Sequence, residues 1–130
     1  MAKTENLEFH IGDTYERNFT ISQYSEDIDE MYLSIKKSND DEKVVLQLTL
    51  DNGLTIVTDE TIDGIRYRTY QIMFDATDTE NMKTGVEYPF DIEIVTDKDT
   101  TKLKKTVVEG YVILNPATTR VWNEVSEWTI

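Results

Sequence analysis

The run FDATDTENMKTGVEYPFDIEIV at residues 74–95 is rich in carboxylates, and the spacing of five of them raises the possibility of catalysis. Glycoside hydrolases need two carboxylates, one acting as a general acid and the other as a base or nucleophile. The candidates are Asp75, Asp78, Glu80, Asp91 and Glu93. The chain holds 26 Asp and Glu among its 130 residues, however, so any one pair of acids carries little information.

The same run also has a structural interpretation. Thr77 and Glu80 have the spacing of a capping box, in which both side chains satisfy free backbone N–H groups at a helix start. Gly85 can end such a helix in a left-handed conformation, which predicts one short crossover helix at residues 78–84. Tyr88 then stands where a tyrosine corner ties a crossover to a β-sandwich through its phenol. Since Asp91 and Glu93 occupy the outward parity of the next strand, the structural interpretation is favoured.

Other residues able to do chemistry are sparse. His10 is the single histidine and there is no cysteine, so zinc–thiolate sites are excluded and a metal or catalytic triad built on His10 is disfavoured. The five glycines are dispersed and form no phosphate-binding motif. The sequence therefore predicts a protein that is not an enzyme, with no catalytic residue, cofactor or resident metal.

Calcium is the stronger rival to a purely structural protein. Three acidic stretches, EDIDE at 26–30, NDDEK at 39–43 and DKD at 97–99, have the oxygen-rich composition that a hard cation prefers. None has the spacing of an EF-hand loop, so solvated turns are the favoured interpretation.

The formal net charge of −13 disfavours nucleic acids and anionic membranes as partners, because the long-range field repels both. The N-terminal residues contain no apolar stretch of signal-peptide length, and no segment is apolar for the roughly 18 residues that a membrane span requires. We expect a chain that is made in the cytoplasm and either stays soluble there or leaves the cell without a cleaved leader, for example in a particle released by lysis.

Alternation of apolar and polar residues dominates the chain and predicts strands. Asp51-Asn52-Gly53 predicts a hairpin turn between two of them, and Arg66 and Arg68 are expected to reach solvent where their strand begins. A lysine-rich turn is predicted at 97–105. Seven or eight strands with short turns indicate an antiparallel sandwich or barrel over residues 1–115. The predicted strands cover residues 15–22, 31–37, 44–50, 53–57, 65–74, 88–95 and 106–115.

The last residues, 116–130, break the alternation. Both tryptophans lie there, and apolar side chains recur at helical spacing while the end could also extend as an edge strand. Aromatic residues are favoured at the centres of protein contacts, which predicts an arm that docks on a neighbouring subunit. Folding back over its own domain is the equal alternative. The predicted partner-binding residues are Val121, Trp122, Val125 and Trp128.

Three segments together resemble the small all-β domains of tailed-bacteriophage structural modules, including the N-terminal domain of baseplate upper proteins. They are residues 10–21, 74–95 and 104–119. The matching positions follow a Gly-Asp-Thr turn, a Gly-to-Tyr turn with its Phe-Asp-Ile strand, and a Thr-to-Gly final strand. These positions are Gly12, Asp13, Thr14, Gly85, Tyr88, Phe90, Asp91, Ile92, Thr106 and Gly110. One extra residue separates Gly85 from Tyr88, and the tryptophan-containing tail has no counterpart.

The resemblance implies an antiparallel immunoglobulin-like β-sandwich of seven to eight strands. It also implies a structural or decoration subunit of a virion, present in many copies on the head, neck, tail or baseplate. Its partners would be other virion proteins, or further copies of itself in a homo-oligomer. The alternative is a carbohydrate- or calcium-binding module that uses exposed aromatic residues such as Tyr24, Tyr67 and Tyr111 beside the acidic loops.

Overall fold

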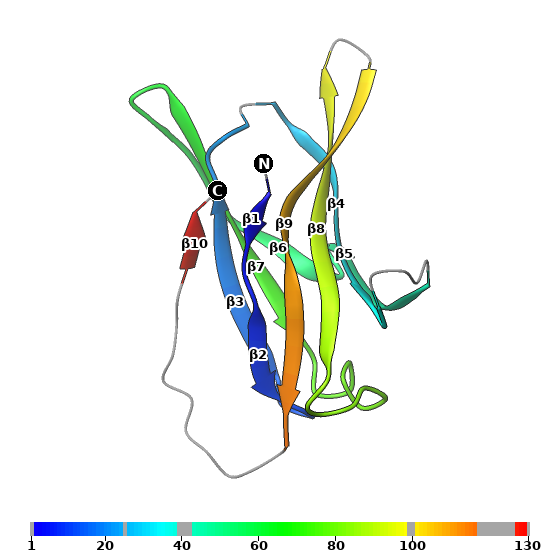
Figure 1. Ribbon diagram of the computed structural model, residues 1–130. Coiled ribbons are helices and arrows are strands. Elements are labelled where there is room, and N and C mark those ends of the chain that lie inside the picture. Colours follow the sequence, from blue (N-terminus) through cyan, green and yellow to red (C-terminus); the bar gives the residue numbers. More distant parts are fainter. Residues whose placement is uncertain (1, 25, 39–42, 99–100, 117–126, 130) are drawn as a thin grey trace.

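A computed structural model describes residues 2–24, 26–38, 43–98, 101–116 and 127–129 (Figure 1). Strands account for most of them, and the predicted strand positions are largely confirmed. The strands of these described residues are β1 (Lys3–Thr4), β2 (Leu7–His10), β3 (Tyr15–Ile21), β4 (Ile28–Lys36), β5 (Val44–Leu50), β6 (Gly53–Ile62), β7 (Ile65–Phe74), β8 (Glu87–Lys98), β9 (Thr101–Asn115) and β10 (Glu127–Thr129).

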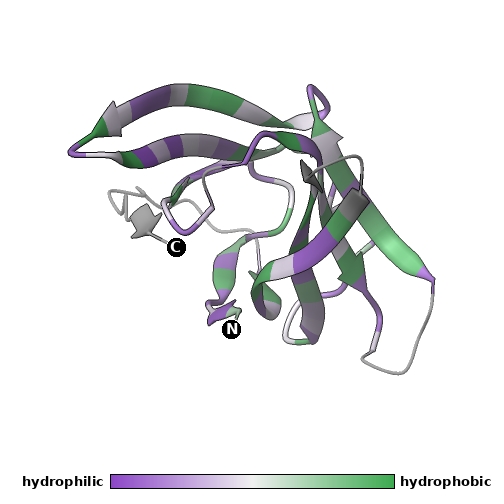
Figure 2. Cartoon of the chain, turned by 90° about the horizontal axis from the view of Figure 1, so that it is seen from above, coloured by the Kyte–Doolittle hydropathy of each residue, from purple (hydrophilic) through white to green (hydrophobic). Residues whose placement is uncertain are grey.

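The strands form one curled sheet, a half-barrel, so the predicted immunoglobulin-like sandwich is wrong (Figure 1). The order is β1-β9-β8-β4-β5-β6-β7-β3-β10, and β2 also pairs with β9. Hydrogen-bonded neighbours follow one another along this whole path, so no break divides the strands into two facing layers. Seen from above, the sheet curves around the space that holds the core (Figure 2).

The bend at residues 51–53 explains why the sheet stays continuous. β5 pairs with β4 and β6 pairs with β7, but β5 and β6 pair only at Thr49↔Gly53 and Leu50↔Leu54, in parallel. The predicted hairpin between them is therefore wrong. The positive φ values that suggested it are present, 66° at Asp51 and 96° at Gly53, yet they bend the chain instead of pairing its two halves.

The sheet is also mixed and not antiparallel. β1 and β2 run parallel to β9, and β10 runs parallel to β3. Because parallel neighbours need a long connection, these pairs join segments far apart in the chain, such as Leu7 with Val112. The pattern of side chains along a strand contains no signal for such a distant partner.

The predicted crossover helix is wrong as well, since residues 75–86 form successive turns and the described residues contain no helix. Two contacts tie these turns to the end of the half-barrel. The buried Thr79 hydroxyl accepts a 3.0 Å hydrogen bond from Gly12 N, and Gly85 N donates at 3.0 Å to the Leu114 carbonyl. Lys83 N donates at 2.7 Å to the Tyr88 hydroxyl, so the predicted phenol hydrogen bond is confirmed although no sandwich corner exists.

The core lies inside the curl, on the parity that the alternation predicted. Phe9 stacks on Tyr15 with ring centroids 4.3 Å apart and lies 5.2 Å from Phe74, which joins β2 to β3 and β7.

The turn predicted at residues 97–105 is shorter than expected, because β8 continues to Lys98 and β9 starts at Thr101. Arg68 lies on the buried face too, and the prediction that it reaches solvent is wrong.

Candidate protein-binding surface

The hairpin of β6 and β7 projects beyond the core, and residues 55–69 are here called the β6–β7 arm (Figure 1). β6 starts at the core with buried Leu54, but each residue from 55 to 62 is exposed. Alternate residues of β7 stay buried as far out as Arg68. One strand of the arm is therefore anchored, and the other presents itself to solvent.

The outer edge of β6 carries no strand for most of its length. Residues 55–62 pair with β7 on one side, and the contact with β5 is limited to the two positions at the base. Within the described residues, no other strand covers that edge. Such an edge presents backbone N–H and C=O groups that can pair with another chain.

Apolar side chains accompany this edge. Ile56 is 48% exposed, Val57 53%, Ile62 50% and Ile65 46%. Figure 2 shows hydrophobic segments alternating with hydrophilic ones along the hairpin, which extends to the left in that view. Ile62 and Ile65 are cross-strand partners, so the tip of the arm presents an apolar pair to solvent.

Two arginines hold the arm in place. Arg68, 1% exposed, donates to the main-chain carbonyls of Glu26, at 2.8 Å, and Tyr24. Arg66 makes a bidentate contact with Asp59, at 2.9 and 2.7 Å, and a 2.8 Å bond to Asp27. The segment between β3 and β4 is thereby pinned against the arm, so the edge of β6 is presented by a supported strand.

These contacts shift the pKa values of the charged groups that make them. The hydrogen bonds from Arg66 lower the pKa of Asp59, and those to Asp59 and Asp27 raise the pKa of Arg66. Burial lowers the pKa of Arg68. Asp59 is the cross-strand partner of Arg68, so the buried cation has a carboxylate on the adjacent strand.

The edge strand itself carries acidic residues, of which Asp59 is paired with Arg66 of the neighbouring strand. From residue 44 to residue 65 the chain has four carboxylates, at Asp51, Asp59, Glu60 and Asp63, and neither Lys nor Arg. Natural edge strands are protected from pairing by lysine and other charged side chains, by proline or by a β-bulge. This stretch has neither lysine nor proline, whereas Asp59 and Glu60 carry charge and a bulge lies between Ile56 and Thr58.

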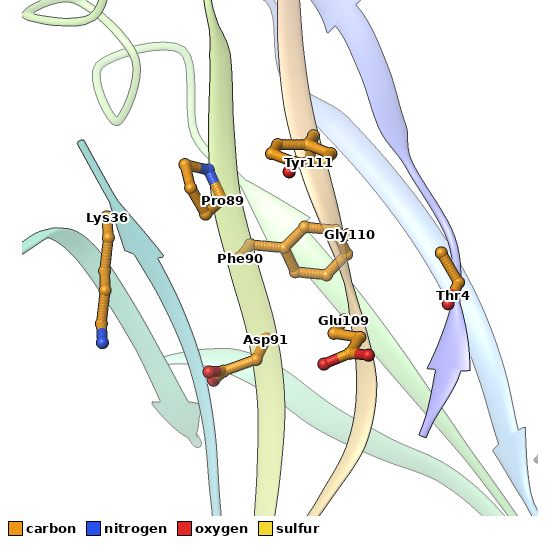
Figure 3. A pocket seen from close by; sticks show the side chains of 8 residues that line it. All are labelled: Thr4, Lys36, Pro89, Phe90, Asp91, Glu109, Gly110 and Tyr111. Carbon is orange, nitrogen blue, oxygen red and sulfur yellow. The ribbon is translucent and has the colours of Figure 1, made fainter. Parts of the chain in front are cut away.

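A second feature is a shallow hollow of about 360 Å³ on the outer face of β8 and β9 (Figure 3). Asp91 and Glu109 lie opposite each other on the paired strands, with Tyr111 and Pro89 above them and Lys36 on β4. Burial, together with the nearby Glu93, raises the pKa of Asp91. An adjoining hollow of about 490 Å³ shares Lys36 and Asp91.

The arrangement in this hollow suits a polar, uncharged or cationic ligand better than an acid–base reaction. Asp91 and Glu109 come from the exposed face of a regular sheet, and no enclosed cleft surrounds them. Among the aromatic residues proposed for ligand binding, Tyr111 lines the hollow, whereas Tyr24 and Tyr67 do not. Tyr24 instead lies under the ammonium of Lys105, 4.5 Å from its ring centroid.

The structure locates only part of the predicted partner-binding segment. Val121, Trp122 and Val125 lie outside the described residues. The backbone of Trp128 belongs to β10 and pairs with Phe19 of β3, at one end of the sheet order. At β10 the segment thus pairs with a strand of its own domain, and docking on a neighbouring subunit stays a prediction.

His10 has a structural environment. It is 2% exposed, and its Nδ1 lies 2.8 Å from the Pro116 carbonyl at the end of the sheet. In the described ranges no group of three or more His, Asp and Glu is placed to hold a metal ion. Asp27 binds Arg66 and Glu30 accepts from Tyr32, so these acids of the first acidic stretch already serve the fold.

Comparison with known proteins adds no relative. No protein-family model matches the chain, and no curated protein matches it. In the described part of the chain, no helix has the length and apolarity that crossing a membrane requires. Function is therefore argued from the two surfaces.

The alternation of apolar and polar residues gives no signal for the β6–β7 arm. The signal that marks it is TIVTDETI at residues 55–62, in which β-branched residues occupy both parities. A half-buried strand would place them on one parity only.

Proposed function

We propose that this chain is a non-enzymatic structural subunit of a multi-protein particle and works through protein–protein contacts. The observation that carries the proposal is the open edge of β6, which stands beside Val57 and Ile62 and lacks lysine and proline. Monomeric proteins rarely leave such an edge uncovered, because it invites uncontrolled pairing. In an assembled particle a neighbouring subunit covers it.

The particle suggested by the sequence resemblance is a tailed-phage virion, with the chain as a structural or decoration protein. The immunoglobulin-like fold that this resemblance implied is wrong, so the proposal rests on the surface of the arm. The strong acidity of the chain fits a multicopy component that must stay soluble before assembly.

The test separates particles from free protein on a density gradient after tagged chain is produced in the cells that make it. We expect the wild type in the particle fraction. The change Val57→Asp should move it to the light fraction, while Val86→Asp, the same change at an exposed valine 37% accessible outside the arm, should leave it with particles. Wild-type chain found only in the light fraction contradicts the proposal.

Residues 116–130 remain a second predicted contact, through Val121, Trp122, Val125 and Trp128. Among the side chains that the structure describes, the core cluster runs from Leu7 to Leu114. Removing residues 117–130 should keep a cooperative unfolding transition and abolish incorporation into particles. Unchanged incorporation would mean that the β6–β7 arm alone makes the contact.

A carbohydrate-binding module is the alternative, favoured by one observation, the hollow of Tyr111, Asp91 and Glu109. Aromatic faces and carboxylates together are suited to stacking on and hydrogen bonding to sugars. Calorimetric titration with soluble cell-wall glycans distinguishes the two, because heat that is lost in Tyr111→Ala supports the module.

A further inference from the structure

We propose that the edge of β6 binds one extended strand of a different protein, with a basic residue opposite Glu60 and β-branched residues two positions to either side. This inference rests on the proposed function and specifies the partner that its surface takes. The binding mode is strand addition, in which backbone hydrogen bonds give affinity and alternate side chains give specificity.

The ladder of β6 and β7 defines the length of the docking stretch. A bulge interrupts the register between Ile56 and Thr58, and from Thr58↔Thr69 to Ile62↔Ile65 the pairing is regular. The regular stretch therefore spans residues 58–62. A strand of about five residues is a common length in globular proteins, so a short segment of a partner suffices.

The alternation within this stretch sets the partner's pattern. Thr58, Glu60 and Ile62 share one face of the hairpin, because side chains of a strand alternate between faces. Asp59 lies on the other face and already binds Arg66. On the first face, cross-strand pairing then favours a β-branched residue opposite Thr58, a lysine or arginine opposite Glu60, and a β-branched residue opposite Ile62.

Charge decides between another protein and a second copy of this chain. Glu60 is exposed and pairs with Tyr67, on the face of the hairpin away from Arg66 and Arg68, and each copy carries a net charge of −13. Two copies approaching edge to edge would repel each other at long range and bring Glu60 of each strand close to the other. A basic segment is attracted by the same field, so we infer a partner of opposite charge.

The experiment uses the full chain and two synthetic peptides, acetyl-TVTKTVT-amide and acetyl-TVTETVT-amide. Amide chemical shifts of the ¹⁵N-labelled protein are followed as each peptide is added. We expect shifts concentrated at residues 55–62, with the lysine peptide binding roughly five- to tenfold more tightly than the glutamate peptide, as opposite rather than like cross-strand charges imply.

The matched variants are Glu60→Lys and Glu87→Lys, which reverse one exposed carboxylate each, on β6 and on β8. Glu60→Lys should invert the preference between the peptides, and Glu87→Lys should keep it. Absence of binding, shifts elsewhere on the sheet, or equal behaviour of the two variants overturns the proposal. Light scattering that finds a dimer of the free chain, lost in Glu60→Lys, also overturns it in favour of a second copy.

The outcome is distinguishable from that of the particle experiment. If the protein enters particles but binds neither peptide, the structural function is supported and the edge of β6 is not the contact. If the protein binds the lysine peptide but stays out of particles, the edge is a docking site and the structural function is contradicted.

Discussion

The guanidinium of Arg68 donates a 2.8 Å hydrogen bond to the main-chain carbonyl of Glu26, 42 residues earlier in the sequence. It also donates to the carbonyl of Tyr24. Arg68 lies near the start of β7, yet its side chain is buried and binds the connection between β3 and β4. The contact joins the arm to the segment between β3 and β4.

The change Arg68→Met should destabilise the protein strongly. It leaves two carbonyls without their donor beneath the arm, and an unsatisfied buried polar group costs about 1–3 kcal/mol. We expect a loss of about 2–5 kcal/mol in the free energy of unfolding, measured by urea denaturation. Arg66→Met, two residues away with partly exposed partners, should cost about 1 kcal/mol or less. Equal losses would contradict the special role of Arg68.

The change Asp91→Asn should stabilise the protein at neutral pH and have no effect in acid. The pKa of Asp91 is raised in the folded protein, so its charge opposes folding above that pKa. As the pH falls, the folded chain takes up the proton before the unfolded chain does, and the penalty disappears. The gain should be up to about 1 kcal/mol at pH 7, the size of an unfavourable cross-strand pair, and absent near about pH 3.

The control for Asp91 is Glu87→Gln, which neutralises an exposed carboxyl on the same strand. Thermal unfolding followed across the pH range compares the two variants with the wild type. A benefit of Asp91→Asn that persisted at acidic pH would show that the effect comes from packing and not from charge.

Gly110→Ala should detach the N-terminal strand. A Cβ at this position would lie 1.6 Å from the Glu5 carbonyl oxygen, which is backbone and cannot move alone. We expect loss of the hydrogen bond from Glu5 N to the Glu109 carbonyl, now 3.0 Å, and a cost of about 1–3 kcal/mol. Hydrogen exchange at Glu5 reports this directly. Glu109→Ala changes the exposed residue next to Gly110 and should leave the Glu5 amide protected from exchange.

Tyr88→Phe should cost about 0.5–1.5 kcal/mol, the net value of one hydrogen bond. The phenol accepts from Lys83 N and holds the turns between β7 and β8. Faster exchange of the Lys83 amide would accompany the loss of stability. Tyr111→Phe on β9 should change neither quantity, and a similar cost there would argue against the turn contact.

Strand positions were predictable because alternation reports which face of a strand is buried. Met31, Leu33 and Ile35 are all buried, as their parity indicated. The arrangement of strands was not predictable in this way. The bend at Asp51 and Gly53 uses the same positive φ values as a hairpin, so the residues alone do not tell whether the two halves pair or continue.

The candidate surface was hidden for a related reason. The alternation at residues 65–74 gives Arg68 the parity of Tyr70, but a buried guanidinium there needs hydrogen-bond acceptors from elsewhere, which the main-chain carbonyls of Tyr24 and Glu26 supply. The sequence spacing of those residues from Arg68 has no periodicity. Tertiary contacts between a strand and a distant connection leave no local signature.

Because β2 runs parallel to β9, a strand near the start of the chain waits for one that is synthesised about a hundred residues later. Asn6 accepts a 3.0 Å hydrogen bond from Tyr111 N across 105 residues, and Leu7 faces Val112. Loop closure over such a distance slows folding, since its entropy is lost before the contacts form. On the ribosome, β2 can therefore pair with β9 only after residue 115 has left the exit tunnel. Until then Phe9 lacks its packing partners from β9, and the early part of the chain stays without a finished core.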